Sequence, residues 1–187
     1  MSTRERIVSA AIEVFYADGF GGAGLREIAQ RASVNVASIY HYFAAKQDLL
    51  VHIIETLERD LIDQAEQATV NAGSPEEALV GLTHNHVAFH ALRWRETAIS
   101  DRELGSVPDD VRPRLIELRD DYEQLWDEVL QAGVEAGTFA VDDREVVRMA
   151  VISMCSTVDA WFRPGGRLSI DEVARIYSRL VLRMLAQ

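Results

Sequence analysis

The segment from Leu25 to Lys46, LREIAQRASVNVASIYHYFAAK, constrains the fold most, because it has the pattern of two short helices joined by a tight turn. Apolar residues at helical spacing predict a first helix over about 25–32. Asn35 is a favourable N-cap for a second helix over 36–43, whose apolar residues lie four apart and face inward. The segment therefore predicts a helix-turn-helix.

The second of these helices has the composition of one that enters a DNA major groove. Such a helix needs small side chains where it meets base edges and phosphate-binding groups on its flanks. Here small residues come first, hydroxyls and an imidazole follow, and Lys46 stands just beyond the helix, within reach of a phosphate.

Residues 4–50 resemble the DNA-binding domain of TetR-family transcriptional regulators. The matching residues are Ile7, Ala10, Ala11, Phe15, Gly19, Phe20, Arg26, Glu27, Ile28, Ala29, Ala32, Val34, Ser38, Ile39, Tyr40, Tyr42, Phe43, Lys46, Leu49 and Leu50. With the side-chain chemistry, this resemblance implies phosphate contacts from Ser38, His41, Tyr42 and Lys46, and base-edge contacts from Val36, Ala37 and Tyr40.

One departure from the family pattern lies just before the first helix of the motif. The family usually has Thr or Ser there, which caps the helix and touches a phosphate. This chain has Ala23-Gly24. We therefore expect the cap to come from the backbone alone, and the phosphate contact to be lost.

The charge distribution qualifies this DNA-binding interpretation. The chain of 187 residues has a formal net charge of -11. Residues 1–50 hold five Lys or Arg and five acidic residues, so the rest carries all of the excess negative charge. Negative charge on residues 51–187 suppresses nonspecific binding to DNA. Only the few cations of residues 1–50 then remain to contact its phosphates.

Targeting signals are not evident in the sequence. The N-terminus lacks the apolar core of a secretory signal, and no apolar run reaches the ~20 residues of a membrane helix. The single cysteine, Cys155, fits a reducing compartment. These features predict a cytoplasmic protein.

The periodicity along the chain predicts an all-α fold of about nine helices. The expected division is a DNA-binding domain over 1–46 and a ligand-binding and dimerisation domain over 47–187. A long helix over 46–69 should bridge the two. The last two helices, at about 143–162 and 170–186, have wide apolar faces. They predict a homodimer through a four-helix bundle, with interface residues Val151, Val158, Ile176, Leu180 and Met184.

Three histidines, His84, His86 and His90, invite a metal interpretation. His86 and His90 share a helix face, but His84 lies about 200° around the helix from His86, so the three cannot converge. No second ligand cluster, nucleophile motif or nucleotide-binding loop accompanies them. The sequence thus predicts no bound metal, no cofactor and no enzyme activity.

The body has residues suited to a ligand cavity, with aromatic walls and a few polar groups. The candidates are His86, His90, Arg93, Trp94, Leu118, Tyr122, Trp126, Val158, Asp159, Trp161 and Arg163. Arg95 and Arg167 are further candidates for phosphate groups at the cavity mouth. A solvated or locally paired stripe is the competing interpretation of His86, His90 and Arg93.

Residues 100–187 resemble a TetR subgroup that responds to acyl-CoA thioesters, including regulators of fatty-acid and steroid-ring breakdown. The match rests on Arg119, Tyr122, Trp126, Gly133, Gly137-Thr138-Phe139, Met154, Trp161-Phe162, Pro164, Gly166 and Leu168-Ser169. Ser156-Thr157 departs from the subgroup's Asn-Trp pair, which leaves the ligand's identity open.

These observations predict a homodimeric transcriptional repressor. It is expected to bind a near-palindromic double-stranded operator and to be released by a small effector, for which the resemblance implies an acyl-CoA. Two alternatives remain: a TetR-type sensor of an unrelated hydrophobic drug or lactone, and an all-helical enzyme with a metal at His86 and His90.

Overall fold

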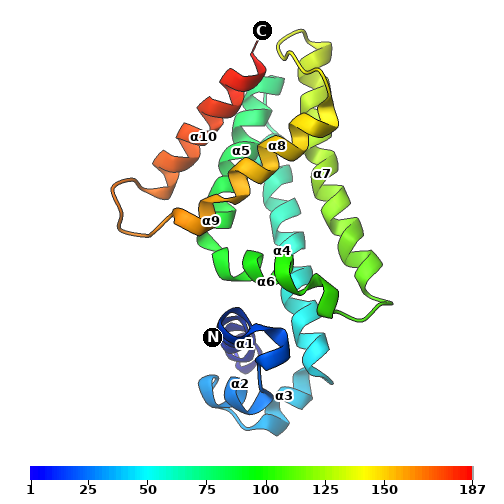
Figure 1. Cartoon of the computed structure of the whole chain (residues 1–187), viewed down its shortest axis with the longest axis vertical. Helices are drawn as coiled ribbons and strands as arrows, with labels where there is room; N and C mark the ends of the chain where they lie inside the picture. Colours follow the sequence, from blue (N-terminus) through cyan, green and yellow to red (C-terminus); the bar gives the residue numbers. More distant parts are fainter. Residues whose placement is uncertain (187) are drawn as a thin grey trace. The chain divides into compact units, whose positions relative to one another are not determined.

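The computed structural model describes residues 1–186 and shows an all-α protein, as the periodicity predicts (Figure 1). The helices are α1 (Thr3–Gly22), α2 (Leu25–Arg31), α3 (Val36–Tyr42), α4 (Lys46–Thr69), α5 (Pro75–Leu92), α6 (Trp94–Glu103), a 3-10 turn η1 (Leu104–Ser106), α7 (Arg112–Glu135), α8 (Arg144–Ser156), α9 (Val158–Trp161) and α10 (Ile170–Leu185). Among the described residues, none of these helices is both long and apolar enough to span a lipid bilayer.

The chain forms two compact units. The head unit comprises Met1–Glu58 and Arg95–Glu117, and the body unit comprises Arg59–Trp94 and Leu118–Gln187. The head unit therefore contains most of α6, which is distant in sequence from the helix-turn-helix. The predicted functional division after residue 46 stays a prediction.

The head unit builds its core from α1, α2 and α3, which lie together beside the start of α4 (Figure 1). Ser2 begins α1 with a capping box, in which its hydroxyl and the Glu5 carboxylate satisfy each other's backbone N–H. Gly19, at φ +70°, bends α1 near its end in a conformation that favours glycine. Asn35 caps α3 by accepting from Ser38 N at 2.7 Å, as predicted.

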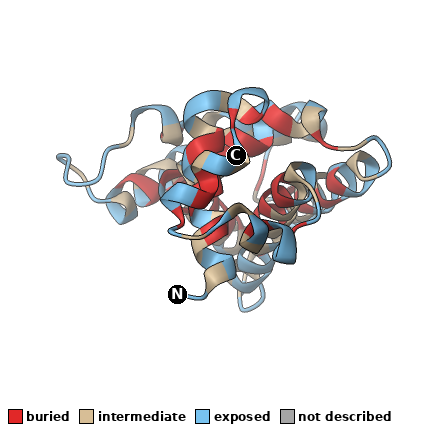
Figure 2. Ribbon diagram, turned by 90° about the horizontal axis from the view of Figure 1, so that it is seen from below, coloured by how far each residue is buried: buried red, intermediate tan, exposed pale blue. Residues whose placement is uncertain are grey.

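The body unit is built around α5, which packs against α8, α9 and α10. Buried residues gather on the inward sides of the helices (Figure 2). The N-caps are Ser74 for α5, Asp143 for α8 and Ser169 for α10. Ser169 forms a complete capping box with Glu172.

A single helix predicted over 143–162 is interrupted at Thr157, which separates α8 from α9. The hydroxyls of Ser156 and Thr157 donate to the carbonyls of Ile152 and Met154, at 2.9 and 2.8 Å. Side chains that bond backward in this way compete with the helical ladder and bend it. Apolar periodicity continues across the break and therefore does not reveal it.

Two segments distant in sequence meet where α7 and α10 end. Phe139 lies so close to Gly133 that a Cβ atom at Gly133 would overlap its ring. Ala140 N then donates to Leu185 O at 2.8 Å. The close approach of the Phe139 ring requires a residue without a side chain at position 133.

Candidate functional site

The outer face of α3 presents the residues that the sequence assigns to DNA. Ala37, Tyr40, His41 and Tyr42 are exposed, with Tyr40 at 55%. Val36 and Ser38 are half-buried, whereas Ile39 and Phe43 on the opposite side are buried in the head core. The proposed base-edge and phosphate residues are therefore accessible together on one helix.

Lys46 has an internal role as well as its proposed phosphate contact. Its Nζ donates to Phe20 O at 2.6 Å and to Ala23 O at 3.0 Å, and it lies 4.3 Å from the centroid of the Phe20 ring. An ammonium has three N–H donors, so one remains for a phosphate. Lys46 thus joins the start of α4 to the end of α1 and to the residue that follows it.

The N-terminus of α2 has the backbone-only cap that the sequence predicts. Gly24 is the N-cap residue, and no side chain caps the helix there. Its carbonyl accepts from Glu27 N and Ile28 N, both at 3.1 Å. Ala23 is buried and offers no hydroxyl, so neither residue can replace the family's Thr or Ser.

Nearby cations in the head are partly engaged. Arg31 pairs with Glu27 at 2.9 Å and with Glu13 at 3.5 Å. Arg4 lies over the Phe43 ring, with its guanidinium carbon 5.4 Å from the ring centroid. Few cations near α3 are therefore free of local contacts, in keeping with the neutral net charge of residues 1–50.

A buried polar cluster lies inside the body unit, centred on His86. Its Nδ1 is 2.6 Å from the Tyr122 hydroxyl and its Nε2 is 2.9 Å from Ser156 Oγ. Because Ser156 uses its own proton to bond Ile152 O, His86 must donate from Nε2 and accept from Tyr122 at Nδ1. The imidazole is neutral, since burial and the neighbouring His90 hold its pKa well below the ordinary value.

His90 and Trp126 extend this cluster and leave polar atoms unbonded. The His86 and His90 rings lie 4.2 Å apart, and Trp126 meets His86 edge-on at 5.7 Å. Within the described residues, His90 Nδ1, Trp126 Nε1 and Thr83 Oγ1 are buried and have no hydrogen-bond partner. Burial lowers the pKa of His90 to about 4. Unbonded polar atoms in an apolar interior cost free energy, which a ligand offering complementary groups would recover.

Other predicted ligand residues lie outside this cluster. Trp161 is 51% exposed and stacks on Tyr177, and with Arg163 and Arg167 it lines a shallow groove of about 220 Å³. Arg163 donates to the carbonyls of Ala160 and Phe162. The prediction that Trp161 walls the same interior as Trp126 is therefore wrong, because Trp161 ends α9 at the surface.

The remaining predicted ligand residues have varied surroundings. Leu118 and Val158 are buried, whereas Trp94 and Asp159 are half-buried. Arg93 pairs with Asp60 at 3.1 Å and lies over the Phe89 ring. Arg93 is thus locally paired, which agrees with the competing interpretation of this one residue.

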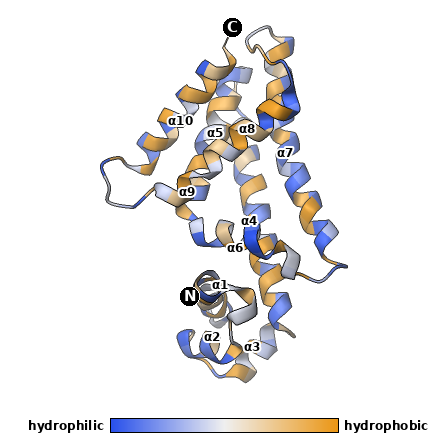
Figure 3. Cartoon of the chain, in the orientation of Figure 1, coloured by the Kyte–Doolittle hydropathy of each residue, from blue (hydrophilic) through white to orange (hydrophobic). Residues whose placement is uncertain are grey.

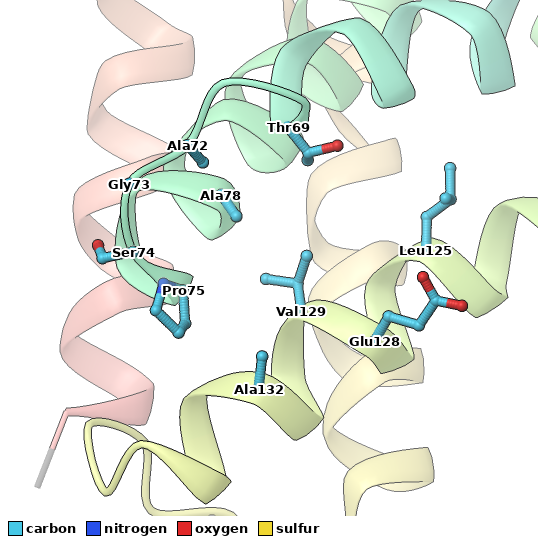
Figure 4. A pocket seen from close by; sticks show the side chains of 10 residues that line it. All are labelled: Thr69, Ala72, Gly73, Ser74, Pro75, Ala78, Leu125, Glu128, Val129 and Ala132. Carbon is cyan, nitrogen blue, oxygen red and sulfur yellow. The ribbon is translucent and has the colours of Figure 1, made fainter.

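A larger groove of about 420 Å³ lies elsewhere in the body unit, between the α4–α5 turn and α7 (Figure 4). It is lined by Thr69, Ala72, Gly73, Ser74, Pro75, Ala78, Leu125, Glu128, Val129 and Ala132. None of the predicted ligand residues lines it. Sequence analysis missed this groove because small residues in a turn are no signal for one.

The predicted dimer residues divide between the interior and the surface. Val151 and Val158 are buried within the chain and have no surface to offer a second copy, so these two assignments are wrong. Leu180 and Met184 on α10 are 44% and 54% exposed, and Ile176 is half-buried. Val146 and Met149 on α8 are exposed apolar residues as well. Figure 3 shows hydrophobic residues along both α8 and α10.

The histidines do not form a metal site in the part of the chain that the structure describes. No group of three or more His, Cys, Asp or Glu residues there has ligand geometry. His84 bonds Asp171 at 3.0 Å, on a different side of α5 from His86.

Comparison with known proteins agrees with this arrangement. Residues 7–53 match the model of bacterial regulatory proteins of the tetR family, and residues 72–185 match that of the tetracyclin repressor-like C-terminal domain. The chain belongs to the TetR family.

Several relatives resemble this TetR-family chain over nearly its whole length. The transcriptional repressor KstR2 of Rhodococcus jostii is 28% identical over 98% of this chain and 91% of its own. The solved TetR-family regulator PfmR of Thermus thermophilus is 30% identical, with a TM-score of 0.86 over 95% of this chain and 97% of its own. AibR, solved with isovaleryl coenzyme A and operator DNA, shares the fold, with a TM-score of 0.84 and 20% identity over 99% and 98%.

Family membership identifies this chain as a DNA-binding transcriptional regulator and not an enzyme. The sequence did not predict two sets of contacts in this TetR-family chain. Ser156, noted only as a departure from a subgroup, completes the His86 network. Arg102 and Glu103 contact the end of α1, and no sequence signal indicated this long-range pairing.

Proposed function

We propose that this chain is a homodimeric repressor that binds a near-palindromic operator and is released by an acyl-CoA thioester. DNA binding is assigned to the exposed face of α3 and to Lys46. Two heads, each with one recognition helix, require half-sites on one face of the DNA. Repression and release are supported by the likeness to KstR2, which is named a transcriptional repressor, and to AibR, which was solved with a CoA thioester and operator DNA.

The buried cluster around His86 is the observation that carries the effector assignment. It combines buried aromatic side chains with the unbonded atoms Trp126 Nε1 and His90 Nδ1. The indole N–H is only a donor, so it needs an acceptor such as an acyl carbonyl oxygen. A carboxylate is unsuited to this place, because the neighbouring imidazoles are neutral and offer it no countercharge.

The CoA end of such a ligand needs different surroundings. Its phosphates would be repelled by an acidic body and require local arginines, whose guanidinium groups fit phosphate oxygens. Arg163 and Arg167, in the groove beside Trp161, are the candidates. Release from DNA requires the ligand to prefer the DNA-incompetent state, and a hundredfold preference corresponds to about 2.7 kcal/mol.

Titration of operator-bound protein with isovaleryl-CoA, longer and cyclic acyl-CoA thioesters, and the matching free acids tests this proposal. The thioesters alone should release the protein. Trp126→Phe should weaken release while operator affinity without ligand is kept, and Arg163→Ala combined with Arg167→Ala should do the same. Release by free acids with inert CoA forms would reject the CoA assignment and favour a general sensor of hydrophobic ligands.

A further inference from the structure

The end of α1 contains a break in its backbone hydrogen bonding, which arises at Gly19. In an uninterrupted helix, Phe20 N–H would donate to the carbonyl of Tyr16. The non-helical backbone of Gly19, with φ +70° and ψ 162°, prevents this pairing. The break therefore frees one donor at Phe20 and one acceptor at Tyr16.

Two adjacent residues at the end of α6 satisfy these freed groups. Glu103 Oε1 accepts from Phe20 N at 3.0 Å. Arg102 Nη2 donates to Phe15 O at 2.7 Å and to Tyr16 O at 3.3 Å. A carboxylate thus takes the freed donor, and a guanidinium takes the freed acceptor and the carbonyl before it. We name this pair the Arg102–Glu103 clasp.

The clasp is itself well held. Arg102 Nε bonds Glu103 Oε1 at 3.0 Å, and the Ser106 hydroxyl donates to Glu103 Oε2 at 3.0 Å. Burial alone would raise the pKa of Glu103, but the bonds from Phe20 N–H, Ser106 and Arg102 outweigh it and lower that pKa. Glu103 is therefore a charged side chain fixed in a largely buried place.

Phe20 is fixed from a second side by α4. Its carbonyl accepts from Lys46 Nζ, and its ring packs edge-on against Phe15 at 5.5 Å. Both backbone groups of Phe20 are consequently bound by side chains, one from α6 and one from α4. These contacts join the helix-turn-helix to α6 within the head unit.

We infer that the Arg102–Glu103 clasp is a positioning element that fixes the direction of the DNA-binding helices relative to α6 and thereby the spacing between operator half-sites. The inference rests on the proposed dimeric repressor. Only Arg93 separates α5 from α6 in the chain. The clasp at the end of α6 therefore lies one helix away in sequence from α5, which carries His86 and His90.

The physical reason is that the clasp restricts rotation at a glycine. Without the Glu103 carboxylate, Phe20 N–H is left unbonded in a buried place, and the bend at Gly19 loses its anchor. The head would still fold around its own core, but it would sample several directions. A dimer with loosely directed heads should tolerate altered half-site spacing, whereas a dimer with fixed heads should not.

The experiment compares operators with different half-site spacing. The wild-type protein first selects its operator from random DNA, and one base pair is then inserted at the centre. Such an insertion moves the half-sites apart and rotates one relative to the other. Affinity for both DNAs is measured for wild type, Glu103→Ala, Arg102→Ala and Glu103→Gln, which keeps an acceptor for Phe20 N–H. Amide exchange at Phe20 is measured in parallel.

Two variants serve as controls. Val14→Ala removes buried volume from the head core without touching the clasp, and Glu117→Ala removes an exposed carboxylate from the same unit. A general loss of head stability would lower the affinity for both DNAs equally. Only a positioning role changes the ratio between them.

We expect the wild type to prefer the native spacing by about tenfold or more, a coupling of ordinary size. Glu103→Ala and Arg102→Ala should reduce that preference to about threefold or less and speed Phe20 exchange, while both controls and Glu103→Gln keep most of the preference. The inference is overturned if Glu103→Ala keeps the wild-type preference for the native spacing. It is also overturned if Val14→Ala reduces that preference as much as Glu103→Ala does. A wild-type protein that selects no DNA overturns the proposed function itself and the inference with it.

Discussion

Gly24, the N-cap of α2, is a position where one added side chain should strengthen the head. Its backbone is extended, at φ -101° and ψ 134°, and an added Cβ would meet no atom within 4 Å. In Gly24→Ser, the hydroxyl can cap the helix and, with Glu27 three residues on, complete a capping box. We expect a gain of a few tenths of a kcal/mol in unfolding free energy, measured by urea denaturation, and tighter operator binding through a restored phosphate contact.

Gly21→Ser is the matched control, because position 21 also has open space around an added Cβ but is not an N-cap. If both variants change stability and operator affinity equally, the capping explanation is wrong.

Lys46 combines two roles at the residue scale, and Lys46→Ala should affect both. Removing the side chain leaves the Phe20 and Ala23 carbonyls without this donor, so the head should unfold more readily. Removing the third N–H should weaken binding to all DNA sequences and lower the slope of log affinity against log salt by about one unit per protomer. A salt series of binding isotherms measures the slope. Weaker binding with an unchanged slope would leave Lys46 only its internal role.

At the scale of elements, α8 and α10 decide the predicted assembly. The exposed apolar residues Val146, Met149, Leu180 and Met184 belong to these two helices. If these helices pair with their symmetry mates in a four-helix bundle, each of these residues is buried in both protomers, because an isologous contact uses the same surface of each. We therefore propose these residues, with Ile176, as the interface in place of Val151 and Val158.

Leu180→Glu tests this assembly. A charge buried on each side of the two-fold axis should split the dimer and abolish operator binding, because buried unpaired charges are costly. Sedimentation measures the oligomeric state. Val70→Glu, at an apolar residue that is 73% exposed at the end of α4, should leave the dimer intact. A wild-type protein that sediments as a monomer at micromolar concentration would contradict the assembly.

At the scale of the whole molecule, the buried imidazoles predict how stability depends on pH. His90 titrates with a pKa of about 4 in the folded chain, against an ordinary value of 6.5. As pH falls below 6.5, the unfolded chain takes up the proton first, so the free energy of unfolding falls until pH reaches about 4. Between pH 6.5 and 5 this loss amounts to about 2 kcal/mol for His90 alone.

Urea denaturation at several pH values measures this loss. His90→Phe should make the curve less steep in this window, because it removes one of the two buried imidazoles and leaves His86. A wild-type curve that is flat from pH 6.5 to 5 would contradict the prediction.

The sequence by itself determined the family, most of the helices and the residues that cap several of them. Apolar periodicity and the residues Asn35, Ser74 and Ser169 act within one or two turns of chain, so local chemistry is enough to specify them. The residues of α3 assigned to DNA could be chosen for the same reason. A short helix has one inward face, which in α3 contains Ile39, and the structure buries that residue. The residues on the other face are therefore the ones that can contact DNA.

Tertiary structure alone decided which distant residues meet. Apolar spacing marks Val151, Val158 and Leu180 alike, but only the packing of α8 and α10 shows that the first two are interior and the third is surface. The His86 network and the Arg102–Glu103 clasp join residues up to 87 positions apart. Such contacts depend on how the helices pack and not on any local pattern. The sequence around Ser156 and Glu103 therefore does not predict their distant partners.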